Sequence, residues 1–407
     1  MSTPAYAERV PAARPTHDEP ASPGLSAGWA VVAILLGIAV AVLSIVAFGM
    51  WADAHDARSA AAQAPPAAPA ATAATAATAA TAHTMPGTAG TGAQQGAVAT
   101  PSFANIAAPN AAKIAAAHKA FPAELPATTP GPVVKVQLEM QHRIVEVAPG
   151  IKYQAWTFGN SVPGPVIHAR QGQTVEVTLT NGSPMAHSVD FHAARVAPDK
   201  AFVDVQPGKS FTFSFKVDDP GVYMYHCGTK PVLAHIANGM FGAIVVDPAD
   251  TSLMPPSHHS FVLVSNEWYL NGPGLKQPAG LDMVKAHEMK PDWVTWNGYA
   301  GQYAAHPLEA HPGHTARFYV VAAGPSLGTA FHVVGTVIDR AWVDGDVLDP
   351  PERGVQTVDV PAGGSGIFDV EIDKPGLYPF VSHSFASVDM GQVGVLNVGG
   401  VTGTMSH

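Results

Sequence analysis

The only cysteine of this 407-residue chain, Cys227, lies in the segment YHCGTKPVLAHIANGM at residues 225–240. His235 and Met240 follow it within the same segment. Two imidazoles, one thiolate and a weakly bound thioether are the ligands of copper electron-transfer sites. The natural second imidazole is His187 in MAHSVDFH, because it follows a predicted strand of the same domain. A lone cysteine is more often an inert core residue, but the ordered Cys, His and Met favour a copper site.

Two further histidines are placed to face away from that core. Side chains alternate between the two faces of a strand, so an inward Cys227 leaves His226 facing outward. His187 and His192 are five residues apart in HSVDFH and point to opposite sides of an extended chain in the same way. Outward histidines beside a copper thiolate indicate a second metal at a surface or interface, with Cys227–His226 as a short covalent route between the two metals.

A third ligand for the second metal must come from elsewhere in the protein. The second half of the chain offers His383 in FVSHSF and His332 in FHVVGT. Three imidazoles leave an open coordination position for a small substrate. Because an interface would supply the third imidazole, we expect this site to depend on assembly of several copies of the chain.

Strands that position these residues begin near residue 133. Segments such as VVKVQLEM and FGAIVVDP alternate or run with β-branched residues, and Pro/Gly turns separate them. This pattern is typical of an antiparallel β-sandwich. The stretch QPGKSFTFSFKVDDPGVYMYH in the first half matches VPAGGSGIFDVEIDKPGLYPFVSH in the second, since both give a strand, a Pro-Gly turn and a strand ending in histidine. The sequence therefore predicts an all-β protein with two tandem sandwich domains, at residues 131–250 and 251–407.

The first third of the chain has a different character. Residues 29–51, WAVVAILLGIAVAVLSIVAFGMW, carry no charge, and a helix of that length reaches roughly 34 Å, enough to cross a bilayer. Two arginines precede this segment and two aspartates follow it, which predicts a cytoplasmic tail at residues 1–28 and an extracytoplasmic bulk, periplasmic or at the cell surface. A cleaved signal peptide is the alternative. Residues 52–130, rich in Ala, Thr and Pro, predict a flexible, disordered tether.

Composition excludes several classes of protein. Charged residues make up only 13% of the chain and the formal net charge is −10, which argues against a nucleic-acid partner. Nineteen histidines stand against one cysteine, which excludes a disulfide scaffold and a thiolate-rich zinc cluster. The set of histidine and thioether ligands also fits a zinc scaffold poorly.

Four segments together resemble one family. HSVDFHAA, YHCGTKPVLAHIANGMFGAIVV, GTAFHVVGTVIDRAWVDG and YPFVSHSF are similar to copper-containing nitrite reductases, in the subclass with the shorter ligand loop. The resemblance covers about residues 133–400 and implies two cupredoxin-like Greek-key domains, each subunit of a homotrimer holding two coppers. It implies one-electron reduction of nitrite to nitric oxide and water, with an external cupredoxin or cytochrome c-like protein as electron donor.

The resemblance also implies a role for each matching residue. The type 1 copper would be held by His187, Cys227, His235 and Met240. The type 2 copper would be held by His192 and His226, with His383 from the neighbouring subunit. Asp190 and His332 would be the acid/base residues. Val334 would lie over the type 2 copper, at a position where the family commonly has isoleucine.

Two other functions fit part of the pattern. A laccase-like two-domain multicopper oxidase needs about eight histidines, usually in HxH pairs, but the chain has HCG at residues 226–228. HPGHT at residues 311–315 has a different spacing and is interpreted as a loop. A non-enzymatic blue-copper carrier would need only the type 1 ligands and would leave His192, His226, Asp190 and His332 without a role.

Overall fold

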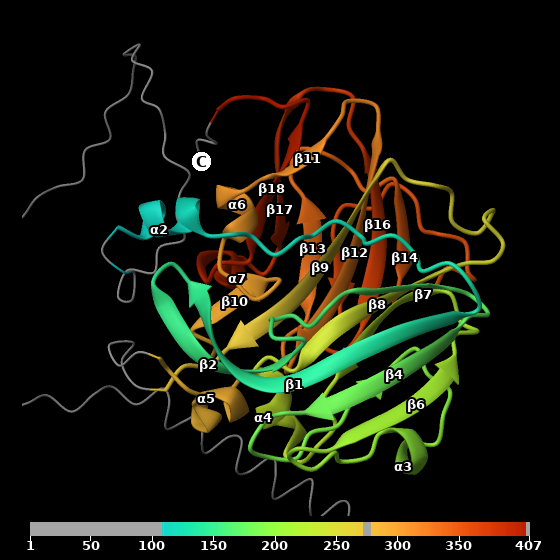
Figure 1. The fold of residues 1–407 in the computed structure, drawn as a ribbon. Helices are drawn as coiled ribbons and strands as arrows, with labels where there is room; N and C mark the ends of the chain where they lie inside the picture. The colour runs from blue at the N-terminus through green and yellow to red at the C-terminus, as the bar shows by residue number, and fades with distance from the viewer. Residues whose placement is uncertain (1–107, 109, 272–277, 404–407) are drawn as a thin grey trace, which may run out of the picture. The chain divides into compact units, whose positions relative to one another are not determined.

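A computed structural model of the chain describes residue 108 and residues 110–271 and 278–403. The predicted anchor at residues 29–51 and most of the predicted tether lie outside these residues. In the described part, no helix has the length and apolar character needed to cross a membrane. Strands dominate, and the helices between them are short (Figure 1).

The first domain consists of two four-stranded sheets packed face to face (Figure 1). The outer sheet has the order β2 (Ile151–Phe158), β1 (Val133–Ala148), β4 (Thr174–Asn181) and β6 (Ser210–Lys216). The inner sheet has the order β3 (Ile167–Arg170), β8 (Phe241–Asp247), β7 (Gly221–His226) and β5 (Asp190–Phe191). Connecting segments contain the short helices α3 (Pro198–Ala201) and α4 (Val232–Ala237).

The second domain repeats this plan with two five-stranded sheets. One has the order β10 (Trp293–Trp296), β9 (His259–Trp268), β12 (Thr315–Gly324), β16 (Ser365–Glu371) and β14 (Arg340–Val343). The other has the order β11 (Leu308–Ala310), β18 (Val393–Val398), β17 (Gly376–Ser382), β13 (Thr329–Val333) and β15 (Val358–Val360). Its short helices are α5 (Met283–His287), α6 (Gln302–Ala305) and α7 (Phe385–Asp389).

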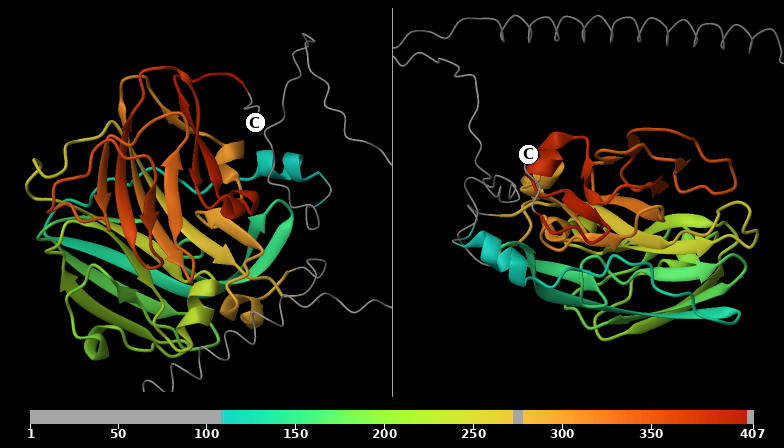
Figure 2. Two further views of the ribbon diagram at one scale, coloured as in Figure 1. Left: turned by 180° about the vertical axis from the view of Figure 1, so that it is seen from behind. Right: turned by 90° about the horizontal axis from the view of Figure 1, so that it is seen from above.

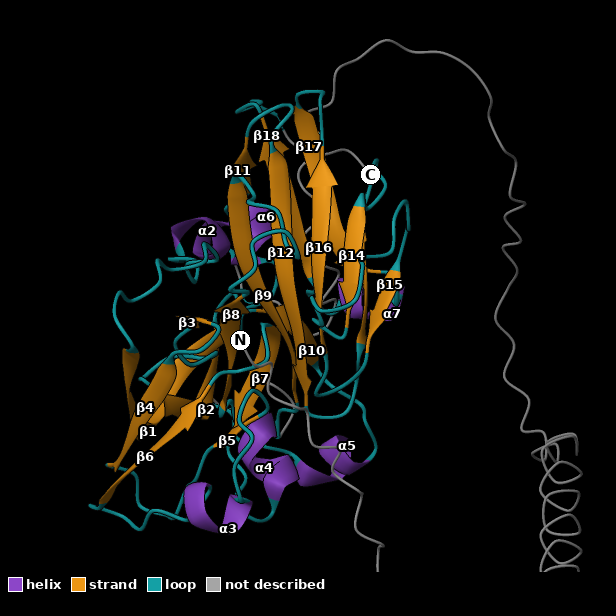
Figure 3. Cartoon of the chain, turned by 90° about the vertical axis from the view of Figure 1, so that its right-hand side faces the viewer, coloured by secondary structure: helices purple, strands orange, loops and turns teal. Residues whose placement is uncertain are grey.

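One hydrophobic cluster is shared between the two sandwiches, and each sandwich also has a cluster of its own. β1 alternates exposed and buried residues along its first half, as a strand of an outer sheet should, whereas β8 is buried along nearly its whole length. The reason is that the inner sheet of the first domain also packs on β12 and β16, so Met224 and Val245 lie in the same apolar cluster as Tyr319 and Ile367 (Figure 3). The structure therefore places β7, the strand that directly precedes Cys227, at the packed junction between the domains.

Most strand pairs are antiparallel, as the sequence predicts for a β-sandwich, but the sheets are not antiparallel throughout. Each of the four sheets contains one parallel pair: β1–β4, β3–β8, β9–β12 and β11–β18. Parallel neighbours require a crossover connection, and here the chain passes through the facing sheet before it returns beside its earlier strand. Periodicity along one strand cannot show this, because it reports burial and not the direction of the neighbouring strand.

The predicted tether extends too far along the chain. Helix α2 (Ala111–Ala117) opens the described part, and the segment after it runs along the second domain (Figure 2). The Val262 N–H donates to the Ala123 carbonyl over 2.7 Å, and the Leu125 N–H to the Ser260 carbonyl over 2.9 Å. Alanine favours helix, and Ala123 is buried against the core, so these residues gain enough packing to order.

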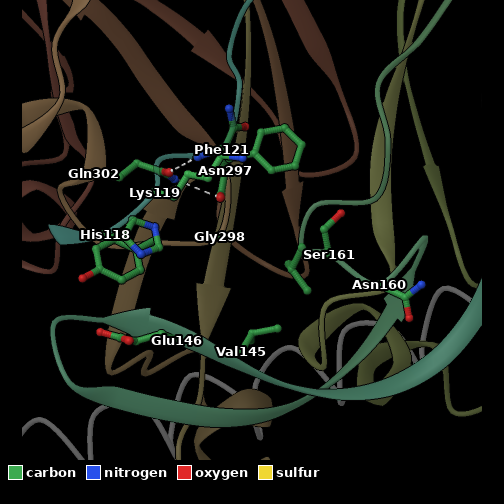
Figure 4. A pocket seen from close by; sticks show the side chains of 12 residues that line it. His118, Lys119, Phe121, Val145, Glu146, Asn160, Ser161, Asn297, Gly298 and Gln302 are labelled. Atoms are coloured by element: carbon green, nitrogen blue, oxygen red, sulfur yellow. Dashed lines mark hydrogen bonds between the residues drawn. The ribbon is translucent and has the colours of Figure 1, made fainter.

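The segment at residues 118–126, called the N-terminal arm below, also borders a pocket between the two domains (Figure 4). His118 stacks on Tyr299 with ring centres 3.7 Å apart, and the Phe121 N–H donates to Gln302 Oε1 over 2.7 Å. Glu146 of β1 lines the same pocket, on the side of His118 (Figure 4). The arm thus closes the junction of the sandwiches and is part of the folded unit.

Candidate metal centres

Three potential ligands converge in the interior of the first domain. His187 lies in the loop after β4, Cys227 directly follows β7, and His235 lies on α4, and all three side chains are fully buried. Cys227 Sγ is 3.1 Å from His235 Nδ1 and 3.9 Å from His187 Nδ1. The two Nδ1 atoms are 3.0 Å apart. Both imidazoles therefore turn the same nitrogen toward the thiol, as two ligands of one ion would.

Met240 lies beside this group. Its carbonyl accepts a hydrogen bond from the Cys227 N–H over 3.0 Å, and its side chain is buried in the same apolar cluster as Cys227. Gly239 precedes it with φ +110°, and a Cβ there would meet Val162 Cγ2 at 2.6 Å, so the turn that delivers Met240 requires glycine. The Ser188 N–H donates to Cys227 Sγ over 3.4 Å. This donor set fits a blue-copper site.

Burial shifts the pKa values of these three side chains. It lowers the pKa of His187 to about 3, where the charge of His235 adds to the effect. Burial also lowers the pKa of His235 to about 4 and raises the pKa of the Cys227 thiol, an effect that hydrogen bonds from Ser188 and Thr229 oppose. At neutral pH both imidazoles are neutral and offer lone pairs, while the thiol must give up its proton to a bound ion.

The copper-free protein should lose stability as pH falls below about 6.5. Both histidines have folded pKa values below their unfolded value, so the unfolded state binds more protons between about pH 6.5 and pH 4. The contribution of the two histidines to the free energy of unfolding is therefore complete above about pH 6.5. It falls toward lower pH by up to about 1.4 kcal/mol per pH unit for each histidine. Urea unfolding of the demetallated protein from pH 7.5 down to 4.5, compared with His235→Ala, measures this slope. An identical slope in the variant would contradict it.

A third histidine beside this group, His142, was missed by the sequence analysis. His142 on β1 pairs with Trp156 on β2 and stacks on it, with ring centres 5.2 Å apart. His142 Nε2 lies 3.4 Å from His187 Nε2, on the side of His187 that faces away from Cys227. The alternation of residues along the strand could have identified it. His142 has the same parity along β1 as the buried Leu138 and Met140, so it points inward.

A second group of ligands forms on the other face of β7. Ligand atoms of Asp190, His192 and His226 all lie within 4.8 Å of one another, at a partly exposed position. The two Nε2 atoms of His192 and His226 are 3.1 Å apart. Asp190 stands directly opposite His226 in the antiparallel β5–β7 pair, which places both side chains on one face of the sheet. The next pair, Phe191 and Tyr225, is buried on the opposite face.

Backbone contacts hold these imidazoles in one tautomer. His226 Nδ1–H donates to the Cys227 carbonyl over 3.0 Å, which leaves Nε2 with its lone pair. His192 hydrogen-bonds to the backbone of Gly363 in the second domain. Burial and then the charge of His226 lower the pKa of His192, so its imidazole is neutral at neutral pH. Hydrogen bonds of this kind orient histidines that bind metals.

His332 and His383 form a separate pair within one chain. They lie on β13 and directly after β17, with ring centres 5.3 Å apart. His332 Nδ1–H donates to the Gln356 carbonyl over 2.7 Å, which leaves Nε2 free. Val334 follows β13, and its N–H donates to the Pro379 carbonyl. Within the described chain the structure does not bring this pair into the group of Asp190, His192 and His226.

The fold and the donor sets define a two-domain cupredoxin-like copper protein. The multicopper oxidase family matches residues 139–251. The copper-containing nitrite reductase of Neisseria gonorrhoeae is 40% identical over 273 residues, which cover 66% of this chain and 69% of that protein. The chain belongs to the copper-containing nitrite reductases.

Solved structures of the family have the same fold. The copper nitrite reductase of Nitrosomonas europaea gives a TM-score of 0.61 at 33% identity, covering 66% of this chain and 94% of that one. The copper-containing nitrite reductase of Thermus scotoductus also gives a TM-score of 0.61, at 28% identity, covering 67% of this chain and 66% of that one. The expectation of a nitrite reductase family is thereby confirmed, and copper is its cofactor.

Proposed function

We propose that the chain reduces nitrite to nitric oxide and water with two coppers per subunit, one in each ligand group. The observation that carries this is the adjacency of His226 and Cys227, whose side chains belong to different ligand groups on opposite faces of β7. The first group, with Met240, suits a type 1 copper, and the second, completed by His383, suits a type 2 copper. When bound, the two coppers supply one electron and an open coordination position for nitrite.

Asp190 is the first proton donor in this proposal. Nitrite, one electron and two protons give nitric oxide and water, so two protons must reach one nitrite oxygen. The Asp190 carboxylate lies beside both His192 and His226, within reach of a ligand held between them. His332 is the second donor, since its Nδ1–H is committed to Gln356 and its Nε2 is free to carry or release a proton.

A homotrimer would complete the type 2 site. His192 is exposed and His226 half-buried, whereas His383 is exposed on the other domain. A neighbouring subunit that supplies His383 also supplies His332, because these two side chains are packed together in one chain. Each site would then combine Asp190, His192 and His226 of one subunit with His332 and His383 of the next. Closed cyclic symmetry requires one such contact per subunit.

The alternative functions fit this geometry less well. A blue-copper carrier has no use for the second group of ligands. A multicopper oxidase needs many more histidines around its cluster, whereas the described chain shows only Asp190, His192 and His226 in the second group. The donor, a cupredoxin or cytochrome c-like protein, and the membrane-anchored, extracytoplasmic location belong to the same proposal and rest on the sequence alone.

Nitric oxide should be formed by the copper-loaded enzyme with a reductant and nitrite. We expect Asp190→Asn to lower turnover by about 100-fold, because a positioned proton donor contributes 10²–10⁴-fold, while the type 1 absorption is unchanged. A nitric oxide electrode and the visible spectrum measure both. Absence of nitric oxide, together with a blue-copper band and no second copper signal, would contradict the reductase proposal. It would favour a blue-copper electron carrier instead.

His142→Phe should raise the reduction potential of the type 1 copper. A copper bound at His187 Nδ1 leaves the proton on Nε2, so the neutral His142 accepts it and makes the His187 ring more electron-rich. Losing a hydrogen bond of about 0.5–1.5 kcal/mol corresponds to about 20–60 mV for one electron. Phenylalanine keeps the stacking on Trp156. A redox titration of the visible band tests this, and an unchanged potential would show that His142 only packs.

A further inference from the structure

A second histidine cluster lies on the other domain, outside both copper groups. His258 directly precedes β9 and His259 is its first residue, while His311 and His314 lie in the turn between β11 and β12. Two of its members, His311 and His314, belong to the HPGHT loop, which nitrite reduction leaves without a role. β11 and the copper-ligand helix α4 lie at opposite ends of the molecule in both Figure 1 and Figure 3.

Three of these rings form a triangle of the size that one metal ion requires. The ring centres of His259 and His311 are 5.5 Å apart, those of His259 and His314 5.6 Å, and those of His311 and His314 5.4 Å. A ring nitrogen about 2.0 Å from a metal places the ring centre about 3 Å from it, so three rings around one ion lie roughly 5 Å apart. The histidine pairs of the two copper groups lie 5.0 and 5.1 Å apart.

The nitrogens of this triangle are available for a ligand. Within the described part of the chain, His259 Nε2 and His314 Nδ1 are buried without a hydrogen-bond partner, a state that is rare for buried polar atoms. Burial, and then the charges of the neighbouring histidines, lower the pKa of both rings. These two nitrogens are therefore the ones that a cation can use as ligands.

The surroundings hold the triangle in place. The Thr315 N–H donates to His258 Nδ1 over 3.1 Å, so this nitrogen already has a partner and His258 acts as a positioning residue. Its ring stacks on His314 with ring centres 4.2 Å apart. Asp373 Oδ1 lies 3.9 Å from the point where a Cβ would stand at Gly313, which puts a negative charge beside the turn.

We propose that His259, His311 and His314 form a third metal site, which binds one divalent late first-row ion, Zn²⁺ or Cu²⁺. Imidazoles suit these ions, whereas Mg²⁺ and Ca²⁺ prefer oxygen ligands. In the copper groups the ligand atoms all lie within 4.8 Å of one another; this triangle is more open. The exposed His311 closes it on an ion by turning its side chain. The site goes beyond nitrite reduction and does not depend on it.

Zinc titration of the full-length enzyme, loaded beforehand with only two copper ions per subunit so that the third site is empty, tests this site. We expect one Zn²⁺ per subunit to bind in addition to the coppers, seen by calorimetry and elemental analysis. Zinc-edge X-ray absorption, which does not detect the coppers, should show three imidazole nitrogens at about 2.0 Å. Cu²⁺ should displace this Zn²⁺, since it binds nitrogen sites more tightly.

Single variants decide whether the triangle is the site. His259→Ala, His311→Ala and His314→Ala should each weaken zinc binding by about 100-fold, because each removes one of three ligands, while type 1 absorption and nitrite turnover stay at the wild-type level. The matched control is His287→Ala, an exposed histidine on α5, which should keep full zinc affinity. Absence of zinc binding by the wild type, or equal affinity in all four variants, would overturn the proposal and leave nitrite reduction untouched.

Discussion

His226→Ala should abolish nitrite turnover while the type 1 colour persists. The His226 ring lies in the group with Asp190 and His192, the proposed type 2 site, with its Nε2 3.1 Å from His192 Nε2. Cys227 beside it lies in the buried group with His187 and His235, the proposed type 1 site. Removing one imidazole leaves too few ligands to hold the second copper. We expect turnover to fall by at least about 100-fold, since even residues that only orient metal ligands cost 10–100-fold.

The experiment separates the two centres because they lie on opposite faces of one strand. Copper content should fall from two to one per subunit, and the visible band should stay within the wild-type range, because His187, Cys227 and His235 are untouched. His287→Ala, on the exposed helix α5, is the matched control and should retain both coppers. Survival of turnover in His226→Ala would show that the second site is wrongly assigned, and loss of the colour would assign His226 to the first.

Sequence reasoning could place the ligands that lie close together along the chain. Cys227, His235 and Met240 are on one strand–loop–helix unit, so strand parity and spacing suffice to bring them together. The same parity places His226 on the opposite face. Each of these inferences depends on local geometry that a single segment determines.

Features that depend on distant segments were not predictable in this way. The parallel pairs in each sheet, the core shared by Met224 and Tyr319, and the docking of residues 118–126 on β9 all join parts of the chain far apart in sequence. The contact of His142 with His187 joins β1 to the loop after β4, 45 residues further along the chain. The composition of residues 110–130 resembles the tether before it, and only the second domain's surface shows why these residues are ordered.

Inter-subunit complementation tests the proposed origin of His383. His192→Ala and His383→Ala should each reduce turnover to about 1% or less when produced alone, because each removes a ligand from every type 2 site. In the proposed trimer, His192 and His226 of one subunit meet His383 of the next. A mixed trimer that contains both variants therefore has one junction at which all three ligands are intact. Turnover should recover to about one third of the wild type in mixed trimers.

Two affinity tags, one on each variant, allow mixed trimers to be isolated after coexpression. The matched control combines His192→Ala with Asp190→Asn, both of which lie on the same side of the junction, so no site regains a complete set and turnover should stay low. Mixing the separately purified variants should also give no recovery unless subunits exchange. If doubly tagged trimers of His192→Ala and His383→Ala stay as inactive as the control, His383 does not act across the interface. A copper-replete, active monomer in size-exclusion and mass measurements would also contradict the proposed trimer. In a monomer, His383 would have to reach His192 of its own chain. In the structure His383 packs against His332 instead and does not join the group of His192.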